Sequence, residues 1–186
     1  MKLTLNDIAD LYLGAGQTLY GGEAVSQLAH ALQSAHFAEQ ANASPYLITA
    51  ALLHDIGHIL AGQQNDDVDA GIDDRHESVA IAALKPLFGQ RVLAPIALHV
   101  EAKRYLSAID PVYHATLSPA SQKSLILQGG VMSKEEVQRF ASNHFAEDAV
   151  FLRRCDDQAK IPDLPTAALA HYLAIAASVC HSEVVA

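Results

Sequence analysis

Tryptophan is absent from this chain of 186 residues, and aromatic residues make up only 6% of it. Alanine and leucine supply much of the hydrophobic content instead, which favours helices packed closely through small side chains. The chain has two cysteines, Cys155 and Cys180, which form neither a CxxC pair nor a disulfide framework. They are interpreted as reduced thiols in a cytoplasmic protein.

Basic residues are also scarce, because 12 Lys and Arg stand against 21 Asp and Glu, for a net charge of −9. This balance argues against a nucleic-acid partner, although local basic residues can still attract a small anionic substrate. Residues 1–16 contain no uninterrupted apolar run, so no signal peptide is evident. The longest apolar stretch, Ala167–Cys180, is too short to span a bilayer. No membrane partner is expected, and the stretch is interpreted as a buried C-terminal helix.

Helical periodicity recurs along the chain without convincing strand alternation, which predicts a compact, all-α bundle in one domain over residues 1–186. Ser44-Pro45, Ser118-Pro119 and the capping-box pattern from Ser133 to Glu136 mark helix starts. The polar stretch 61–74 is expected to be a surface loop, with Asp73 or Asp74 capping the next helix. The expected helices cover 4–13, 23–41, 45–58, 76–88, 90–106, 119–128, a segment from 134, 147–160 and a last segment from 166.

The most informative local feature is the pair His54-Asp55, inside the sequence LLHDIGH. A carboxylate on an apolar helix needs a compensating charge or several donors, and a divalent metal ion supplies that charge. His30 and Asp156 lie on other expected helices among apolar neighbours. Together these four residues form a nitrogen and oxygen ligand set that suits iron, manganese or zinc.

Two further histidines, His76 and His99, lie on separate expected helices and would give a second ion two imidazoles. Asp55 would then bridge the two ions. The second site has fewer protein ligands, which leaves coordination positions for substrate or water. The first site would contain His30, His54, Asp55 and Asp156, and the second Asp55, His76 and His99.

Each of these residues also has an ordinary structural explanation. A single histidine such as His30 or His99 is more often a core residue bonded to a backbone carbonyl, and His76 could lie at an exposed helix start. Asp156-Asp157 could lie on a solvated helix face, and the neighbouring pairs Lys103-Arg104 and Arg153-Arg154 are typical of a surface. The metal hypothesis requires all of these explanations to fail together. No role is assigned to His36, His114, His144, His171 or His181.

The pattern of His30, His54-Asp55 and Asp156 resembles the HD-domain superfamily of helical metalloproteins. With the two further histidines it resembles the mixed-valent diiron oxygenase branch, in which myo-inositol oxygenase is a distant relative. Over residues 20–160 it is most similar to enzymes that cleave the carbon–phosphorus bond of 1-hydroxy-2-aminoethylphosphonates. The resemblance implies two iron ions in the Fe(II)/Fe(III) state, dioxygen as co-substrate, and phosphate with glycine or glycine betaine as products.

The resemblance also implies roles for individual residues. Tyr20 would coordinate the open iron in the resting enzyme, and Glu23 would help admit the substrate and face its amine. Helical spacing is consistent with phosphonate contacts one turn from the metal ligands, because residues four or three apart share a helix face. The implied catalytic residues are Tyr20, Glu23 and Asp55, and the implied substrate contacts are Glu23, His58, Lys103, Ser121 and Arg153.

Two other functions remain open at this point. The resemblance to HD-domain proteins also implies an alternative, a metal-dependent phosphohydrolase of a phosphate ester or nucleotide, which is their commoner activity and in which a metal-bound hydroxide attacks phosphorus. A degenerate HD domain could instead serve as a regulatory module, although such domains typically lose ligands. The amine of the substrate is also undecided, since a primary ammonium would pair with Glu23 while a trimethylammonium would favour aromatic contacts. The oligomeric state is not indicated.

Overall fold

The computed structural model describes residues 3–20, 23–62 and 75–181, which fold into eleven α-helices and one short 3-10 helix. Strands are absent from these ranges, where only two isolated β-bridges occur, Leu19 with Ser26 and Phe88 with Cys180. The prediction of an all-α fold is confirmed. The helices are α1 (Leu5–Leu13), η1 (Ala15–Gln17), α2 (Gln27–Gln40), α3 (Pro45–Leu53), α4 (Ile56–Leu60), α5 (His76–Leu84), α6 (Gln90–Ile109), α7 (Pro111–Thr116), α8 (Pro119–Leu127), α9 (Lys134–Ala141), α10 (Ala146–Gln158) and α11 (Leu169–Ala177).

Hydroxyl side chains begin many of these helices, as the sequence predicts. Ser44 and Ser118 each accept a hydrogen bond from the backbone N–H three residues later, and a proline follows each of them at the first helical position. The capping box at Ser133 is confirmed, because its side chain and that of Glu136 each accept a backbone N–H of the other residue. Such caps satisfy N–H groups that have no partner within the helix.

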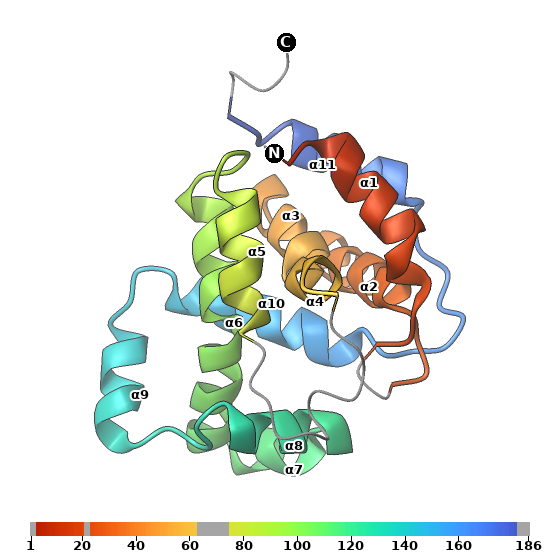
Figure 1. The fold of residues 1–186 in the computed structure, drawn as a ribbon. Helices are drawn as coiled ribbons and strands as arrows, with labels where there is room; N and C mark the ends of the chain where they lie inside the picture. The colour runs from red at the N-terminus through yellow and green to blue at the C-terminus, as the bar shows by residue number, and fades with distance from the viewer. Residues whose placement is uncertain (1–2, 21–22, 63–74, 182–186) are drawn as a thin grey trace.

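Helix α3 lies at the centre of the molecule and packs against α2, α6, α10 and α11 (Figure 1). Its Leu52 and Leu53 are fully buried, together with Ile56 of α4, Ile96 of α6 and Leu152 of α10. Helices α7 and α8 lie at the opposite end of the molecule from α1 and α11 (Figure 1). The largest hydrophobic core thus surrounds α3, the helix that leads directly into His54 and Asp55.

Two expected helices have different boundaries in the structure. Helix α2 begins at Gln27 rather than at residue 23, because the Ser26 side chain accepts the N–H of Ala29 and caps the helix there. Glu23 therefore lies outside this helix and does not share a helical stripe with His30. The helix expected over 45–58 is divided, and Asp55 lies in the turn between α3 and α4 with φ −103° and ψ 8°.

The start of α5 also differs from the expectation. Arg75 occupies its N-cap position in the left-handed region, with φ 48° and no side-chain cap, so the prediction of an aspartate cap is wrong. Asp73, Asp74 and most of the expected loop 61–74 lie outside the described residues. Among the helices in the described ranges, none combines the length and apolarity that a bilayer span requires.

Candidate metal centre

The six predicted metal ligands converge although they come from five parts of the chain. All six are buried, with 8% exposure or less. Their donor atoms form two groups, each within 4.8 Å, that share a single carboxylate. The first group contains His30 of α2, His54 and Asp55 of the α3–α4 turn, and Asp156 of α10; the second contains Asp55, His76 of α5 and His99 of α6.

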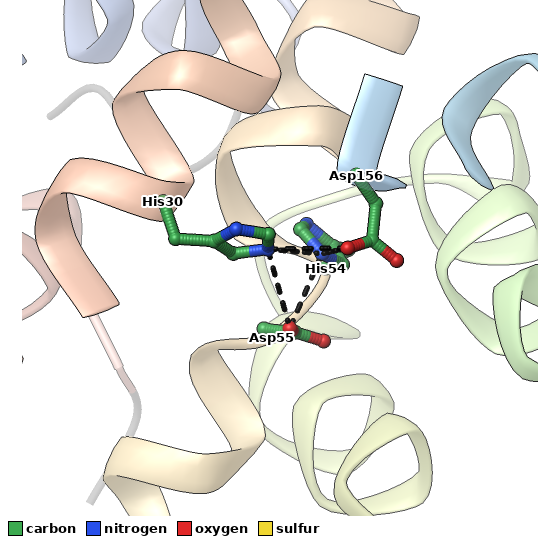
Figure 2. A group of neighbouring side chains, drawn as sticks. All are labelled: His30, His54, Asp55 and Asp156. Atoms are coloured by element: carbon green, nitrogen blue, oxygen red, sulfur yellow. Dashed lines mark hydrogen bonds and ion pairs between the residues drawn. The ribbon is translucent and has the colours of Figure 1, made fainter. Parts of the chain in front are cut away.

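The first group surrounds a small space between the helices (Figure 2). His30 Nε2 lies 3.6 Å from Asp55 Oδ2 and 3.3 Å from Asp156 Oδ1. His54 Nε2 lies 3.3 Å from the same Asp55 oxygen and 3.8 Å from the same Asp156 oxygen. The two imidazole Nε2 atoms are 3.3 Å apart. Two nitrogens and two oxygens therefore face one point.

The second group uses the other oxygen of Asp55. His76 Nε2 and His99 Nε2 lie 3.3 Å and 3.4 Å from Asp55 Oδ1, and 3.0 Å from each other. Because each Asp55 oxygen faces a different pair of imidazoles, this carboxylate has the geometry of a bridge. The turn between α3 and α4 makes that position possible, since it projects Asp55 between the two groups rather than along one helix face.

Backbone carbonyls fix the orientation of three of the imidazoles. Nδ1 of His30 lies 2.8 Å from Ala159 O, that of His54 2.9 Å from Ala51 O, and that of His99 2.7 Å from Ile96 O. A carbonyl only accepts, so each Nδ1 carries a proton, and in the neutral ring Nε2 keeps the lone pair that can bind a metal ion. Facing lone pairs about 3 Å apart repel one another unless a cation lies between them, and metal-binding histidines are oriented in this way. The donor set thus fits two metal ions.

The carboxylates lead to the same conclusion. In the part of the chain that the structure describes, Asp55 Oδ1 and Asp156 Oδ1 are buried oxygens that accept no hydrogen bond. Burial alone would raise the pKa of Asp55 and Asp156, but His54 and Arg153 respectively hold each well below its usual range. Burial alone lowers the pKa of His54, yet the two carboxylates raise it to about 10, so either a second proton on its Nε2 or a metal ion must balance their charge. Two ionised carboxylates in a buried site therefore require positive charge close to them.

Arg153 distinguishes Asp156 from the neighbouring Asp157. Its Nη1 lies 2.8 Å from Asp156 Oδ2, which leaves Oδ1 facing the imidazoles. Its Nη2 pairs with Asp157 Oδ1, and its Nε donates to Tyr113 Oη at 3.2 Å. Tyr113 in turn donates to Asp157 Oδ2 at 2.7 Å. The guanidinium thus anchors a predicted metal ligand, and its implied contact with a phosphonate remains a prediction.

Tyr20 lies directly over the first group. Its hydroxyl donates to Asp55 Oδ2 at 2.7 Å, and its ring stacks on His30 with centroids 3.8 Å apart. Burial and the charges of Asp55 and Asp156 raise the pKa of Tyr20 well above its usual value. His58 stacks on His76 at 4.0 Å between centroids, next to the second group. Both residues are thus beside the centre, and coordination by Tyr20 remains a prediction.

Lys103 of α6 contacts α8 through Ser124, three residues after Ser121. Lys103 is 3% exposed and donates from Nζ to Ser124 Oγ at 2.7 Å. Burial and the nearby charge of Arg153 lower the pKa of Lys103 to about 7. Ser118, Ser121 and Ser124 are spaced by three residues and therefore share a face of α8. This serine face lies between Lys103 and a second lysine, Lys160, which donates to Ser118 and Ser121.

Sequence reasoning missed Lys160 and Tyr113. Lys160 Nζ lies 3.0 Å from Glu23 Oε1, so the predicted amine-facing carboxylate already has a cationic partner. A weak signal was present, because Lys160 follows Asp156 by four residues and the helix was expected to reach residue 160. In the structure α10 ends at Gln158, and Lys160 lies just beyond it. Tyr113 offered no such signal, since its link to Arg153 depends on how α7 packs.

Comparisons with known proteins agree with this geometry. The family described as HD domain matches residues 28–147. A protein of Gimesia maris named hydroxymethylphosphonate dioxygenase is 44% identical over 90% of this chain and 84% of its own length. A protein of Leisingera caerulea named [1-hydroxy-2-(trimethylamino)ethyl]phosphonate dioxygenase (glycine-betaine-forming) is 36% identical over 89% of this chain and 84% of its own. An uncharacterized protein of Acanthamoeba polyphaga mimivirus is 37% identical over 84% and 73%.

Proposed function

Because this chain belongs to the HD domain family, we propose that it is a metal-dependent dioxygenase that cleaves the carbon–phosphorus bond of a 1-hydroxyphosphonate. The observation that carries the proposal is the second ligand group, in which His76 and His99 face the oxygen of Asp55 that His30 and His54 do not use. The names of two relatives supply the reaction class. The sequence expectation of a 1-hydroxy-2-aminoethylphosphonate substrate falls within this class.

The cofactor of the proposal is a pair of metal ions, and we assign them as iron in the Fe(II)/Fe(III) state from the sequence resemblance. The imidazole and carboxylate donors fit iron, although they also accept manganese or zinc. When bound, the ions supply the electrons and the coordination positions that dioxygen activation requires. The protein holds them through rings whose orientation the carbonyls of residues 51, 96 and 159 fix.

The residues around the ions would orient the substrate. Lys103 donates to Ser124 of α8, one helical turn from Ser121. A lysine that becomes charged beside a phosphonate dianion forms a charge-assisted hydrogen bond. His58, stacked on His76, lies next to the second group. Such positioning places C1 of the substrate near the reacting oxygen and lowers the entropic part of the barrier. Tyr20 donates to Asp55, and the sequence resemblance implies that an arriving substrate displaces the Tyr20 hydroxyl.

The atoms of the proposed reaction balance with dioxygen as the only oxidant. C1 of a 1-hydroxyphosphonate loses hydrogen and its bond to phosphorus and becomes a carboxylate carbon. One new oxygen is bound to carbon and one to phosphorus, so the products are a carboxylate and inorganic phosphate. A 1-hydroxy-2-aminoethylphosphonate would give glycine, and its trimethylated form would give glycine betaine.

The test is phosphate release by the iron-loaded protein with a panel of 1-hydroxyphosphonates, in air and under strict anaerobiosis. The proposal expects phosphate release that consumes oxygen and stops without it. Phosphate release from an ester that continues without oxygen would instead support the phosphohydrolase alternative, which needs only the first ligand group. No oxygen uptake with any member of the panel would refute the proposal.

A further inference from the structure

Lys160 forms a largely enclosed ion pair beside the metal centre. Its Nζ lies 3.0 Å from Glu23 Oε1, and the two side chains are 15% and 17% exposed. The same ammonium donates to Ser118 Oγ at 3.2 Å and to Ser121 Oγ at 3.1 Å. The Ser118 hydroxyl donates to the same Glu23 oxygen at 2.7 Å. Glu23 is thus held by a cation and a hydroxyl that both belong to the protein.

Backbone contacts connect this pair to the metal centre on both sides. The N–H of Glu23 donates to Tyr20 O at 2.7 Å, and Tyr20 contacts both His30 and Asp55. Lys160 directly follows Ala159, whose carbonyl accepts Nδ1 of His30 at 2.8 Å. The Glu23–Lys160 pair therefore lies beyond the ring of His30 and next to Ser121, one of the predicted phosphonate contacts.

The charge of this pair bears on which substrate fits. Although burial alone would raise the pKa of Glu23, Ser118 and Lys160 lower it, so the carboxylate is ionised and neutralised internally. A substrate ammonium would have to compete with Lys160 for this carboxylate, and it would also be repelled by the Lys160 ammonium. In a partly dehydrated site such repulsion is weakly screened. A substrate with an uncharged group at that position would meet neither obstacle.

We propose that Lys160 is the specificity-determining residue of this site, and that it selects 1-hydroxyphosphonates without an ammonium group by keeping Glu23 neutralised. The inference rests on the proposed function and narrows its substrate class. It also reverses the sequence expectation that Glu23 pairs with a substrate amine. The family resemblance assigns no role to Lys160.

Two probes of nearly equal size isolate the charge. 1-Hydroxy-2-aminoethylphosphonate and 1-hydroxypropylphosphonate differ only in carrying an ammonium or a methyl group at the same position. The experiment measures kcat/KM by phosphate release, and also the Kd of each probe for the metal-loaded protein under anaerobic conditions. It compares the wild type with Lys160→Met, Glu23→Gln and the double variant. Lys85→Met, which removes an exposed lysine of the α5–α6 connection, is the control.

The proposal expects the wild type to prefer the methyl probe. Lys160→Met leaves Glu23 without its cationic partner. The ratio of kcat/KM for the ammonium probe to that for the methyl probe should therefore rise by about tenfold or more, the size of one charged hydrogen bond. Glu23→Gln leaves Lys160 without its anionic partner and should lower the same ratio, further against the ammonium probe. The double variant should lose the gain of Lys160→Met, because the receiving carboxylate is gone. Lys85→Met should not change the ratio.

The outcomes separate this inference from the function on which it rests. No phosphate from either probe or from hydroxymethylphosphonate would refute the proposed function. Phosphate release with a wild-type preference for the ammonium probe would refute the role of Lys160 alone. Equal losses for both probes in Lys160→Met would show that Lys160 is merely structural. Should that variant fail to fold, the wild-type preference and the direction of the Glu23→Gln shift still decide the question.

Discussion

At the scale of single residues, the centre depends most on Asp55. Its Oδ2 faces His30 and His54, while its Oδ1 faces His76 and His99. No other carboxylate in the described residues belongs to both ligand groups. Replacement of this one side chain should therefore affect two ions at once, which a ligand of only one group would not do.

We expect Asp55→Asn to lower the metal content well below that of the wild type and to reduce phosphate release by about 100-fold or more, since even indirect ligand contacts contribute 10- to 100-fold. The amide keeps the shape of the side chain but lacks the charge that two ions share. Metal analysis after anaerobic reconstitution checks this. Glu101→Gln, an exposed change on α6, is the matched control. Unchanged metal content in Asp55→Asn would contradict the bridging assignment.

Lys103 should make substrate binding depend on pH. Its pKa is lowered to about 7, so in the free protein it loses its proton as the pH rises above that value. A bound phosphonate dianion favours the charged form, so binding must be accompanied by proton uptake at higher pH. The Kd for the substrate should therefore increase by up to about tenfold per pH unit above pH 7.

The substrate's own titration is common to the wild type and Lys103→Arg, so it cancels when the two are compared. The difference that remains is the titration of Lys103, because arginine stays protonated throughout. Binding measured by calorimetry from pH 6 to 9 should show the extra slope only in the wild type. Equal slopes in both proteins would exclude Lys103 as its source. Lys103→Ala should weaken binding at every pH with metal content nearly intact, and a loss of metal would give Lys103 a structural role instead.

At the scale of helices, the sequence predicts starts better than interruptions. Ser44, Ser118 and Ser133 begin helices as expected because a cap is a local hydrogen bond that a short motif encodes. The interruption at His54-Asp55 was not predicted, since the apolar residues around it are equally compatible with one continuous helix. Helices from distant parts of the chain pack against α3 and α4 on either side of this turn, and local periodicity does not encode such packing.

Gly57 fixes the contact between α4 and α5. A Cβ atom at this position would lie 1.9 Å from the backbone oxygen of His76. Gly57→Ala must therefore push α5 away and move His76 from the second ligand group. We expect a loss of about 1–3 kcal/mol in stability, as for other overpacked sites, together with fewer metal ions per chain.

Chemical denaturation and metal analysis test this prediction, with Gly89→Ala as the control for metal content. A Cβ at residue 89 would meet its nearest neighbour, a ring carbon of His181, at an ordinary 3.7 Å. A Gly57→Ala protein with the wild-type metal content would show that His76 is not needed for the second ion.

At the scale of the whole molecule, the identity of the ligands was easier to predict than their surroundings. Each histidine or aspartate alone has an ordinary structural explanation, but the set of six indicated one metal centre, and the structure brings their donor atoms together. The partners of Glu23 could not be derived in this way. They come from α8 and from the residues after α10, and only the packing of those elements brings Ser118 and Lys160 together.

The same convergence predicts that metal binding stabilises the entire fold. The ligands come from α2, the α3–α4 turn, α5, α6 and α10, so the unfolded chain cannot present them together. At a free metal concentration near 100 times Kd, selective binding to the folded state contributes about 2.7 kcal/mol per site. For a chain of this size, each kcal/mol raises Tm by about 2–4 °C.

The Tm values of the metal-loaded and the chelator-treated protein, measured by calorimetry, should therefore differ by about 5–10 °C for one site and more for two. Asp55→Asn should lose most of this difference, whereas Glu101→Gln should keep it. Equal Tm values for the loaded and metal-free wild type would mean that these buried imidazoles and carboxylates hold no ion.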